Sequence, residues 1–98
     1  METFSEIINA NRLVLVDFFA TWCSPCKMMH PVLEQLKGEL GEEIRIIKLD
    51  VDKNETVAAA YRIQSVPTLV LFRGGEILWR QSGAVSLADL KSRISAFQ

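Results

Sequence analysis

The chain has 98 residues, of which 49% are hydrophobic and 23% are charged, and its formal net charge is −1. A chain of this length has room for one hydrophobic core, so we expect a single domain over residues 1–98. The near-zero charge favours neither nucleic acid nor an anionic membrane, and no apolar stretch reaches the roughly 20 residues that cross a bilayer. The composition therefore indicates a small globular domain without a nucleic-acid or membrane partner.

The N-terminus begins with acidic and polar residues and lacks the pattern of a secretory signal peptide. We therefore expect a cytoplasmic protein, in a compartment that keeps thiols reduced. A lone Cys-x-x-Cys pair in that compartment favours redox chemistry or metal binding over a structural crosslink.

The first elements in the chain are a short helix and a buried strand. Thr3 and Glu6 have the spacing of a capping box, which predicts a helix over about 4–10. Residues 12–20 carry apolar side chains on both alternating faces, and this pattern is typical of a central strand that is buried on both sides.

A long helix and a second strand follow. The helix is expected to start at Cys23 or Ser24 and to reach about residue 40, with a kink at Pro31 instead of a break into two helices. Residues 43–49 then predict a strand that lies parallel to the first one across a helical crossover.

The second half predicts a helix, a hairpin with a two-residue Gly-Gly connection, and a final helix. These elements are expected at 54–62, with Asn54 as the N-cap, at 68–73 and 76–81, and after Ser86. The order implies an α/β fold with a mixed four-stranded sheet and four helices on its two faces. Strand 12–20 would be central, between 43–49 and the antiparallel 68–73, with 76–81 at the edge.

Both cysteines lie in one hexapeptide at the strand-to-helix junction, Trp22-Cys23-Ser24-Pro25-Cys26-Lys27. A spacing of three on a helix places both side chains on one face, close to the geometry of an unstrained disulfide. The helix N-terminus should stabilise a Cys23 thiolate, while Cys26 should be less exposed. The pattern predicts that Cys23 attacks a disulfide and that Cys26 resolves the mixed disulfide. Pro25 fits the first helical turn and restricts the loop.

A metal site is the main alternative for this pair. A structural zinc site uses four ligands, whereas the chain has two cysteines and one histidine, His30. We therefore expect no bound metal and interpret His30 as a partly exposed helix residue.

Asp17 lies in the middle of the apolar strand, where burial should raise its pKa. Such a group could serve as a base for the resolving thiol, or it could cap a backbone group or pair with a lysine. The residues alone leave these two roles open. Lys48 in the neighbouring strand is the nearest candidate cation, and a solvent-facing orientation is its alternative.

This ordered set of motifs resembles the thioredoxin family over almost the whole chain. The resemblance rests on the residues around the two cysteines, on the apolar strand with Asp17, and on Pro31, Lys48-Leu49-Asp50-Val51-Asp52, Val66-Pro67-Thr68, Phe72, Gly74-Gly75-Glu76 and Gly83-Ala84. It implies a thioredoxin fold, with Cys23 as an exposed nucleophile, Cys26 as the resolving cysteine, and Asp17 as a buried acid that Lys48 tunes.

The resemblance also implies how a protein substrate would bind. Pro67 would be a cis-proline that faces the disulfide, and the backbone of Val66 would pair with an extended substrate segment. The residues implied as the binding rim are Trp22, Ser24, Pro25, Val66, Pro67, Gly83 and Ala84.

The implied activity is the reduction of disulfides in protein substrates by a monomer that binds no cofactor. Electrons would come from NADPH through a thioredoxin reductase, because the chain contains no Gly-rich dinucleotide fingerprint. A thiol oxidase or isomerase of an oxidising compartment and a non-catalytic binding subunit are the alternatives.

Three positions depart from the family pattern. Ser24 replaces the commonest glycine between the cysteines, where residues tune the redox potential. Phe19 stands where tryptophan is usual, which removes a quenching signal. No strand precedes Thr3, so strand 43–49 is expected at an edge of the sheet.

Overall fold

The computed structural model describes all 98 residues, and its elements follow the predicted order. Their bounds are α1 (Phe4–Asn9), β1 (Leu13–Phe19), α2 (Ser24–Leu40), the 3₁₀ turn η1 (Gly41–Glu43), β2 (Ile44–Asp50), α3 (Glu55–Ala60), β3 (Thr68–Arg73), β4 (Glu76–Ser82) and α4 (Leu87–Ser95).

The four strands form one mixed sheet in the order β2-β1-β3-β4. Strand β1 is parallel to β2 and antiparallel to β3, and β3 is antiparallel to β4. The predicted topology is therefore confirmed, including the central position of β1 and the edge position of β2. The β3–β4 register shifts at Leu71/Phe72, where a bulge interrupts the ladder.

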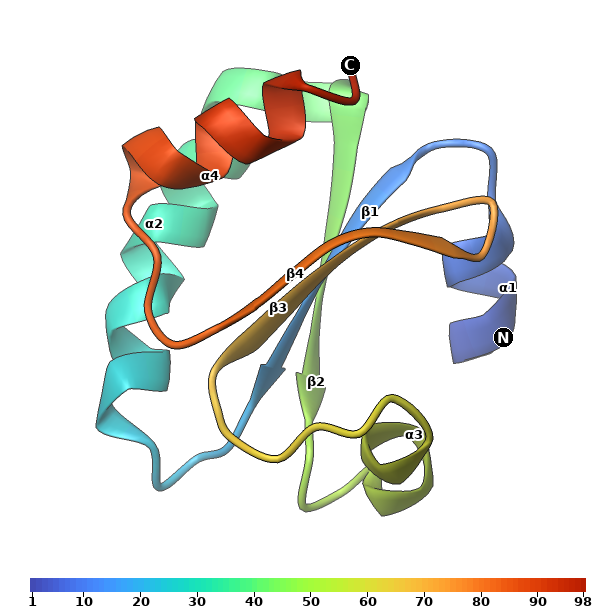
Figure 1. Ribbon diagram of the computed structural model, residues 1–98, viewed down its shortest axis with the longest axis vertical. Helices are drawn as coiled ribbons and strands as arrows, with labels where there is room; N and C mark the ends of the chain where they lie inside the picture. Colours follow the sequence, from blue (N-terminus) through green and yellow to red (C-terminus); the bar gives the residue numbers. More distant parts are fainter.

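Helices cover both faces of the sheet, with α2 and α4 on one side and α1 and α3 on the other (Figure 1). Side chains alternate along β1 between the two faces. Leu13 and Leu15 pack with α2 and α4, whereas Val14, Val16 and Phe18 pack toward α1 and α3. Asp17 has the same parity as Leu13 and Leu15, so it points to the α2 face.

Helix α2 runs as one element through Pro31, as the sequence predicts. It begins at Ser24 because Cys23 holds the N-cap position in extended conformation. It ends at Gly41, which has φ +54° and ψ −124°, a conformation that glycine adopts with little strain. Strand β1 is hydrogen-bonded to β2 and β3, and the start of α2 is capped by Cys23. These two elements thus fix the position of the cysteine loop between them.

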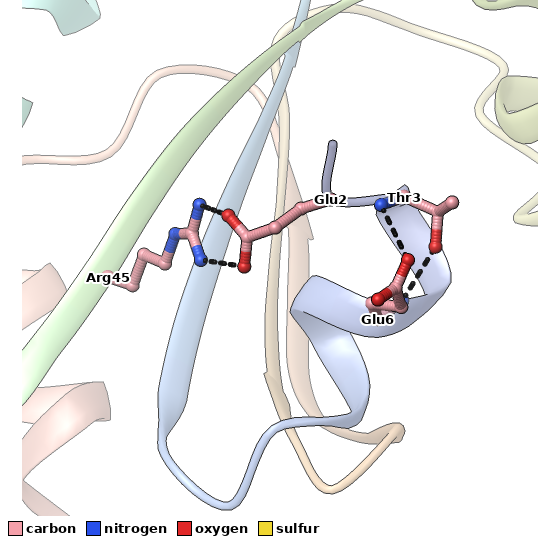
Figure 2. A network of polar contacts seen from close by, with 4 residues as sticks. All are labelled: Glu2, Thr3, Glu6 and Arg45. Atoms are coloured by element: carbon pink, nitrogen blue, oxygen red, sulfur yellow. Dashed lines mark hydrogen bonds and ion pairs between the residues drawn. The ribbon is translucent and has the colours of Figure 1, made fainter.

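The N-terminal segment is attached to the edge strand (Figure 2). Thr3 and Glu6 form the predicted capping box, with both hydrogen bonds at 3.1 Å. Beside it, the Glu2 carboxylate accepts two hydrogen bonds from the Arg45 guanidinium of β2, at 2.6 and 2.9 Å. Arg45 lowers the pKa of Glu2 through this contact.

The third helix is shorter than predicted, because the chain leaves the helix after Ala60 and Arg62 has a φ of +53°. Asn54 occupies the N-cap position, but its side chain does not cap the helix. Its amide instead donates to the Asp50 carbonyl at 2.9 Å, which ties the start of α3 to the end of β2. No helix of the structure combines the length and the apolar character needed to cross a membrane.

Candidate active site

A disulfide links Cys23 and Cys26 at the junction of β1 and α2, with their Cα atoms 5.2 Å apart. The Cys23 sulfur accepts a hydrogen bond from the Cys26 backbone N–H at 3.1 Å, as a side chain at an N-cap does. The unpaired amides and the dipole of a helix N-terminus stabilise negative charge. The sulfur of Cys23 is therefore the one placed to carry a thiolate when the disulfide opens.

Both cysteines are buried, at 4% exposure for Cys23 and 1% for Cys26. The predicted order of exposure holds, but the expectation of an exposed Cys23 is wrong in extent. The two cysteines form a small apolar cluster with Ala20, and the partly buried side chains of Phe19 and Val66 pack against this cluster. A partner disulfide must therefore come into close contact with the residues that surround Cys23 in order to reach its sulfur. We call these surrounding residues the rim.

The loop before β3 forms one side of this rim. The Val66–Pro67 bond is cis, and the Val66 carbonyl oxygen lies 3.6 Å from the Cys23 sulfur. The Val66 N–H takes part in none of the loop's backbone hydrogen bonds. Gly83, at φ +90°, donates its N–H to the Pro67 carbonyl at 2.8 Å and so fixes the loop. Because Pro67 is buried, the rim offers backbone at this point more than the proline ring.

Trp22 forms the opposite side and is 70% exposed. Its indole N–H donates to the Asp52 carboxylate at 2.9 Å, which holds a large apolar ring in one orientation at the surface. The local sequence around Asp52 does not indicate this contact. The available signal was topological, since β1 and β2 are parallel and the segments after them emerge at the same edge of the sheet.

Two cavities lie beside the cysteine loop. One, of about 140 Å³, is lined by Trp22, Val51, Ile63, Gln64, Ser65 and Val66. The other, of about 250 Å³, lies between α2 and the segment before α4 and is lined by Met28, Met29, Val32, Ala84, Val85 and Ser86. The predicted rim residues Ser24, Pro25, Gly83 and Ala84 are all exposed. Ile63 and Met28 extend the apolar rim beyond the predicted set.

Asp17 is 1% exposed, and neither of its carboxyl oxygens has a hydrogen-bond partner. Burial raises the pKa of Asp17 to about 6, and the positive charge of Lys48 opposes this rise. The structural alternative for Asp17, a cap or a direct lysine pair, is thus absent from the structure. The carboxyl group can hold or release a proton close to neutral pH.

Lys48 is the register partner of Asp17 across the β1–β2 ladder, as the sequence predicts for a neighbouring cation, but the residue is exposed, in agreement with the solvent-facing alternative. Its ammonium group, however, lies 2.7 Å from Nδ1 of His30 on α2 and forms no ion pair with Asp17. No three His, Cys, Asp or Glu side chains converge as ligands of a metal ion would.

Comparison with known proteins identifies the family. Residues 1–96 match the family model described as Thioredoxin. The thioredoxin-like protein slr0233 of Synechocystis is 44% identical over 95 residues, which cover 96% of this chain and 90% of that protein. The thioredoxin of Pyropia yezoensis is 42% identical over 92 residues, which cover 94% and 86%.

A third relative and a solved structure extend the comparison. The bifunctional thioredoxin reductase/thioredoxin of Mycobacterium leprae is 44% identical over 92 residues, which cover 94% of this chain and 20% of that protein. A structure titled "Structure of a malarial protein" superposes with a TM-score of 0.83 at 34% identity, and the match covers 88% of this chain and 97% of that one. The chain therefore belongs to the thioredoxin family and is a thiol–disulfide oxidoreductase whose redox-active group is the Cys23–Cys26 pair.

Proposed function

We propose that the chain reduces disulfides in protein substrates, with Cys23 as the nucleophile and Cys26 as the resolving cysteine. One observation carries this assignment: the Cys23 sulfur accepts the Cys26 N–H at the helix N-terminus, where a thiolate is stabilised. Cys26 lies in the first turn of α2 and is the more buried of the two.

The reaction transfers two electrons from the dithiol to the substrate. The Cys23 thiolate attacks one sulfur of the substrate disulfide, the substrate S–S bond breaks, and the departing thiolate takes up a proton. Cys26 then loses its proton and attacks the Cys23 sulfur of the mixed disulfide. The second substrate thiol leaves, and the Cys23–Cys26 disulfide is restored.

Asp17 is the proposed acceptor of the Cys26 proton. A general base is most effective when its pKa lies near the working pH. The pKa of about 6 that burial gives to Asp17 meets this condition far better than an ordinary carboxyl group does. Lys48 tunes this group through its charge, in opposition to burial.

Substrate binding is proposed at the rim around Cys23. The free backbone N–H of Val66, next to the cis Pro67, would pair with an extended substrate segment. Exposed apolar surface on Trp22 and the flanking segments would contact the side chains of that segment. The proposed rim comprises Trp22, Ser24, Pro25, Val66, Pro67, Gly83 and Ala84.

We further propose that a thioredoxin reductase restores the dithiol with electrons from NADPH. The name of the M. leprae relative joins a thioredoxin reductase and a thioredoxin in one bifunctional protein, which supports this partnership. The chain would act as a monomeric domain in the cytoplasm, where the thiol pool keeps the dithiol state populated.

The test is a trapping experiment with a model protein disulfide such as insulin. The Cys26→Ser variant should accumulate a mixed disulfide with the substrate that dithiothreitol releases, since the resolving thiol is missing. The Cys23→Ser variant is the matched control and should trap nothing. Normal turnover by Cys26→Ser would disprove the two-cysteine mechanism.

The reduction potential of the pair separates a reductant from an oxidase or isomerase. Equilibration with glutathione buffers should give a potential near or below the cytosolic glutathione poise. A potential well above that poise would instead support an oxidase or isomerase. A binding subunit would keep its biological function in the Cys23→Ser/Cys26→Ser double variant.

A further inference from the structure

The contact between His30 and Lys48 links α2 to the edge strand directly beside the buried acid. His30 follows Cys26 by one helical turn, and its Nδ1 lies 2.7 Å from the Lys48 ammonium nitrogen. The His30 ring also packs edge-on against Phe19 of β1, with ring centroids 6.4 Å apart and an interplanar angle of 70°. Two independent contacts therefore fix the orientation of the half-buried imidazole.

The chemistry of this contact fixes its direction. An ammonium group has donors and no acceptor, so Nδ1 of His30 must accept the hydrogen bond and carry no proton. The pair thus joins a cation to a neutral acceptor. A lysine placed opposite a buried carboxylate would be expected to pair with that carboxylate, since an opposite charge is the strongest partner available.

The observed arrangement differs from that expectation. Asp17 and Lys48 are register partners in adjacent parallel strands, so their side chains leave the same face of the sheet. Even so, both Asp17 oxygens lack a hydrogen-bond partner, and the Lys48 ammonium group contacts the imidazole. The ion pairs of the structure, Glu2–Arg45 and Glu39–Lys91, involve neither residue.

We propose that His30 is a positioning residue that holds the Lys48 ammonium group away from the Asp17 carboxylate and so keeps the buried acid without an ion-pair partner. The inference rests on the proposed role of Asp17 as a proton acceptor. His30 touches neither the substrate nor the reacting sulfurs in this scheme. Through Lys48, it sets how readily Asp17 takes up a proton.

Removal of the His30 imidazole, which accepts the hydrogen bond from Lys48, should change the pKa of Asp17. In a His30→Ala variant the Lys48 ammonium group loses its hydrogen-bond acceptor on α2, and we expect it to turn toward Asp17, the opposite charge at the paired position of β1. An opposite charge within about 4–6 Å lowers the pKa of a carboxyl group by about 1–3 units. The pKa of Asp17 should therefore fall from about 6 by about one unit.

The measurement is an NMR titration of the ¹³C-labelled Asp17 carboxyl group in the oxidised protein, where the cysteines do not titrate. Three variants make the test specific. His30→Ala should lower the pKa of Asp17, and His30→Asn should restore it because the amide oxygen replaces Nδ1 as the acceptor. In a Lys48→Met background, His30→Ala should leave the pKa of Asp17 unchanged.

The proposal is overturned if His30→Ala leaves the pKa of Asp17 unchanged or raises it, or if the same fall occurs without Lys48. A purely structural role of His30 would alter the free energy of unfolding without this lysine-dependent titration. Because the oxidised protein is used, the titration does not depend on turnover. Failure of the proposed function would show separately, as the absence of trapping by Cys26→Ser.

Discussion

Asp17 is the residue at which function and stability oppose each other. A carboxyl group at 1% exposure without hydrogen-bond partners destabilises the folded state once it ionises. The pKa of about 6 in the folded chain, against 3.8 for an unperturbed group, expresses this penalty. The same penalty raises the pKa of the carboxyl group and so makes it useful as a proton acceptor. The protein therefore keeps a carboxyl group in its core although the ionised form destabilises the fold.

Asp17→Asn should stabilise the protein at neutral pH. With a raised pKa, the stabilising contribution of the protonated group is complete below pH 3.8 and is lost as the pH rises through about 6. The shift of about two units corresponds to about 3 kcal/mol in the free energy of unfolding. Urea unfolding of the oxidised proteins should show the variant gaining this amount over wild type between pH 4 and pH 7. A pH-independent difference would argue against a buried titrating carboxyl at this position.

The same substitution should slow disulfide exchange near neutral pH, because the amide cannot accept the Cys26 proton. A stabilised but slow variant would separate the two roles of this residue. A fast variant would assign the proton to another acceptor.

The sequence indicates the reacting residues of the site but not the residues that position them. Cys23, Cys26 and Asp17 were predicted because their types and spacing are unusual in their surroundings. The partners His30 and Asp52 were not, because their contacts join segments 18 and 30 residues apart in the chain. The packing of α2 against β2 brings His30 to Lys48, and the parallel pairing of β1 with β2 brings Trp22 to Asp52.

At the scale of elements, α2 carries both cysteines and depends on how its two ends are built. Its N-terminus is capped by the Cys23 sulfur, and its C-terminus is closed by Lys37. The Lys37 ammonium group donates to the carbonyls of Gly41 and Ile44, both at 2.7 Å. These hydrogen bonds hold the end of α2 to the start of β2 and so fix the helix relative to the sheet. The position of the cysteine loop depends on this arrangement, because the loop joins β1 of the sheet to α2.

Two glycines near this end should respond oppositely to the same substitution. Gly38 is inside α2 with open space where a Cβ would stand, so Gly38→Ala should stabilise the protein by about 0.5–1 kcal/mol. Gly41 also has open space, but its φ of +54° is strained for any other residue, so Gly41→Ala should destabilise by about 1 kcal/mol or more. Thermal or urea unfolding of the two variants provides the comparison, and two changes of the same sign would contradict it.

The predicted elements were correct where local pattern and tertiary packing agree. Buried β1 and the Gly74-Gly75 hairpin are such cases. The errors lie at boundaries, as at α3, where the positive φ of Arg62 ends the helix early. Arg80 of β4 donates hydrogen bonds to the carbonyls of Tyr61 and Arg62 there, and no local pattern predicts a clamp from a distant strand.

At the scale of the whole molecule, one central sheet separates the two larger apolar clusters, and the redox pair follows the end of β1, one of the two interior strands. This arrangement was predictable, because a doubly buried strand must be central and the crossover to a parallel strand must carry a helix. The depth of Cys23 was not predictable. Its 4% exposure reflects the packing with Ala20 and Cys26 together with the Val66 carbonyl oxygen 3.6 Å from the sulfur, and a sequence pattern does not measure how closely two loops approach.

The oxidised protein should be more stable than the reduced one. A disulfide across a separation of three residues removes chain entropy from the unfolded state, by about 2 kcal/mol in the loop-closure treatment. Urea unfolding with and without a reductant should reveal this difference, and the Cys23→Ser/Cys26→Ser double variant should show none. By linkage, the folded dithiol would then be a stronger reductant than the unfolded chain. If the oxidised and reduced proteins had equal free energies of unfolding, folding would not contribute to the reducing power of the dithiol.

With Phe19 at the position where the family usually has tryptophan, any emission change on reduction has to come from one of the two tryptophans that remain, Trp22 and Trp79. Trp22 directly precedes Cys23 in the chain, and we expect the nearby disulfide to quench part of its emission in the oxidised protein. Trp79 packs against the cluster beneath α2 and α4, apart from the cluster that contains the cysteines. A rise in emission on reduction would therefore come from the one ring that substrates are proposed to touch, while Trp79 serves as an internal reference. Electron transfer and docking could then be followed in real time without any added dye.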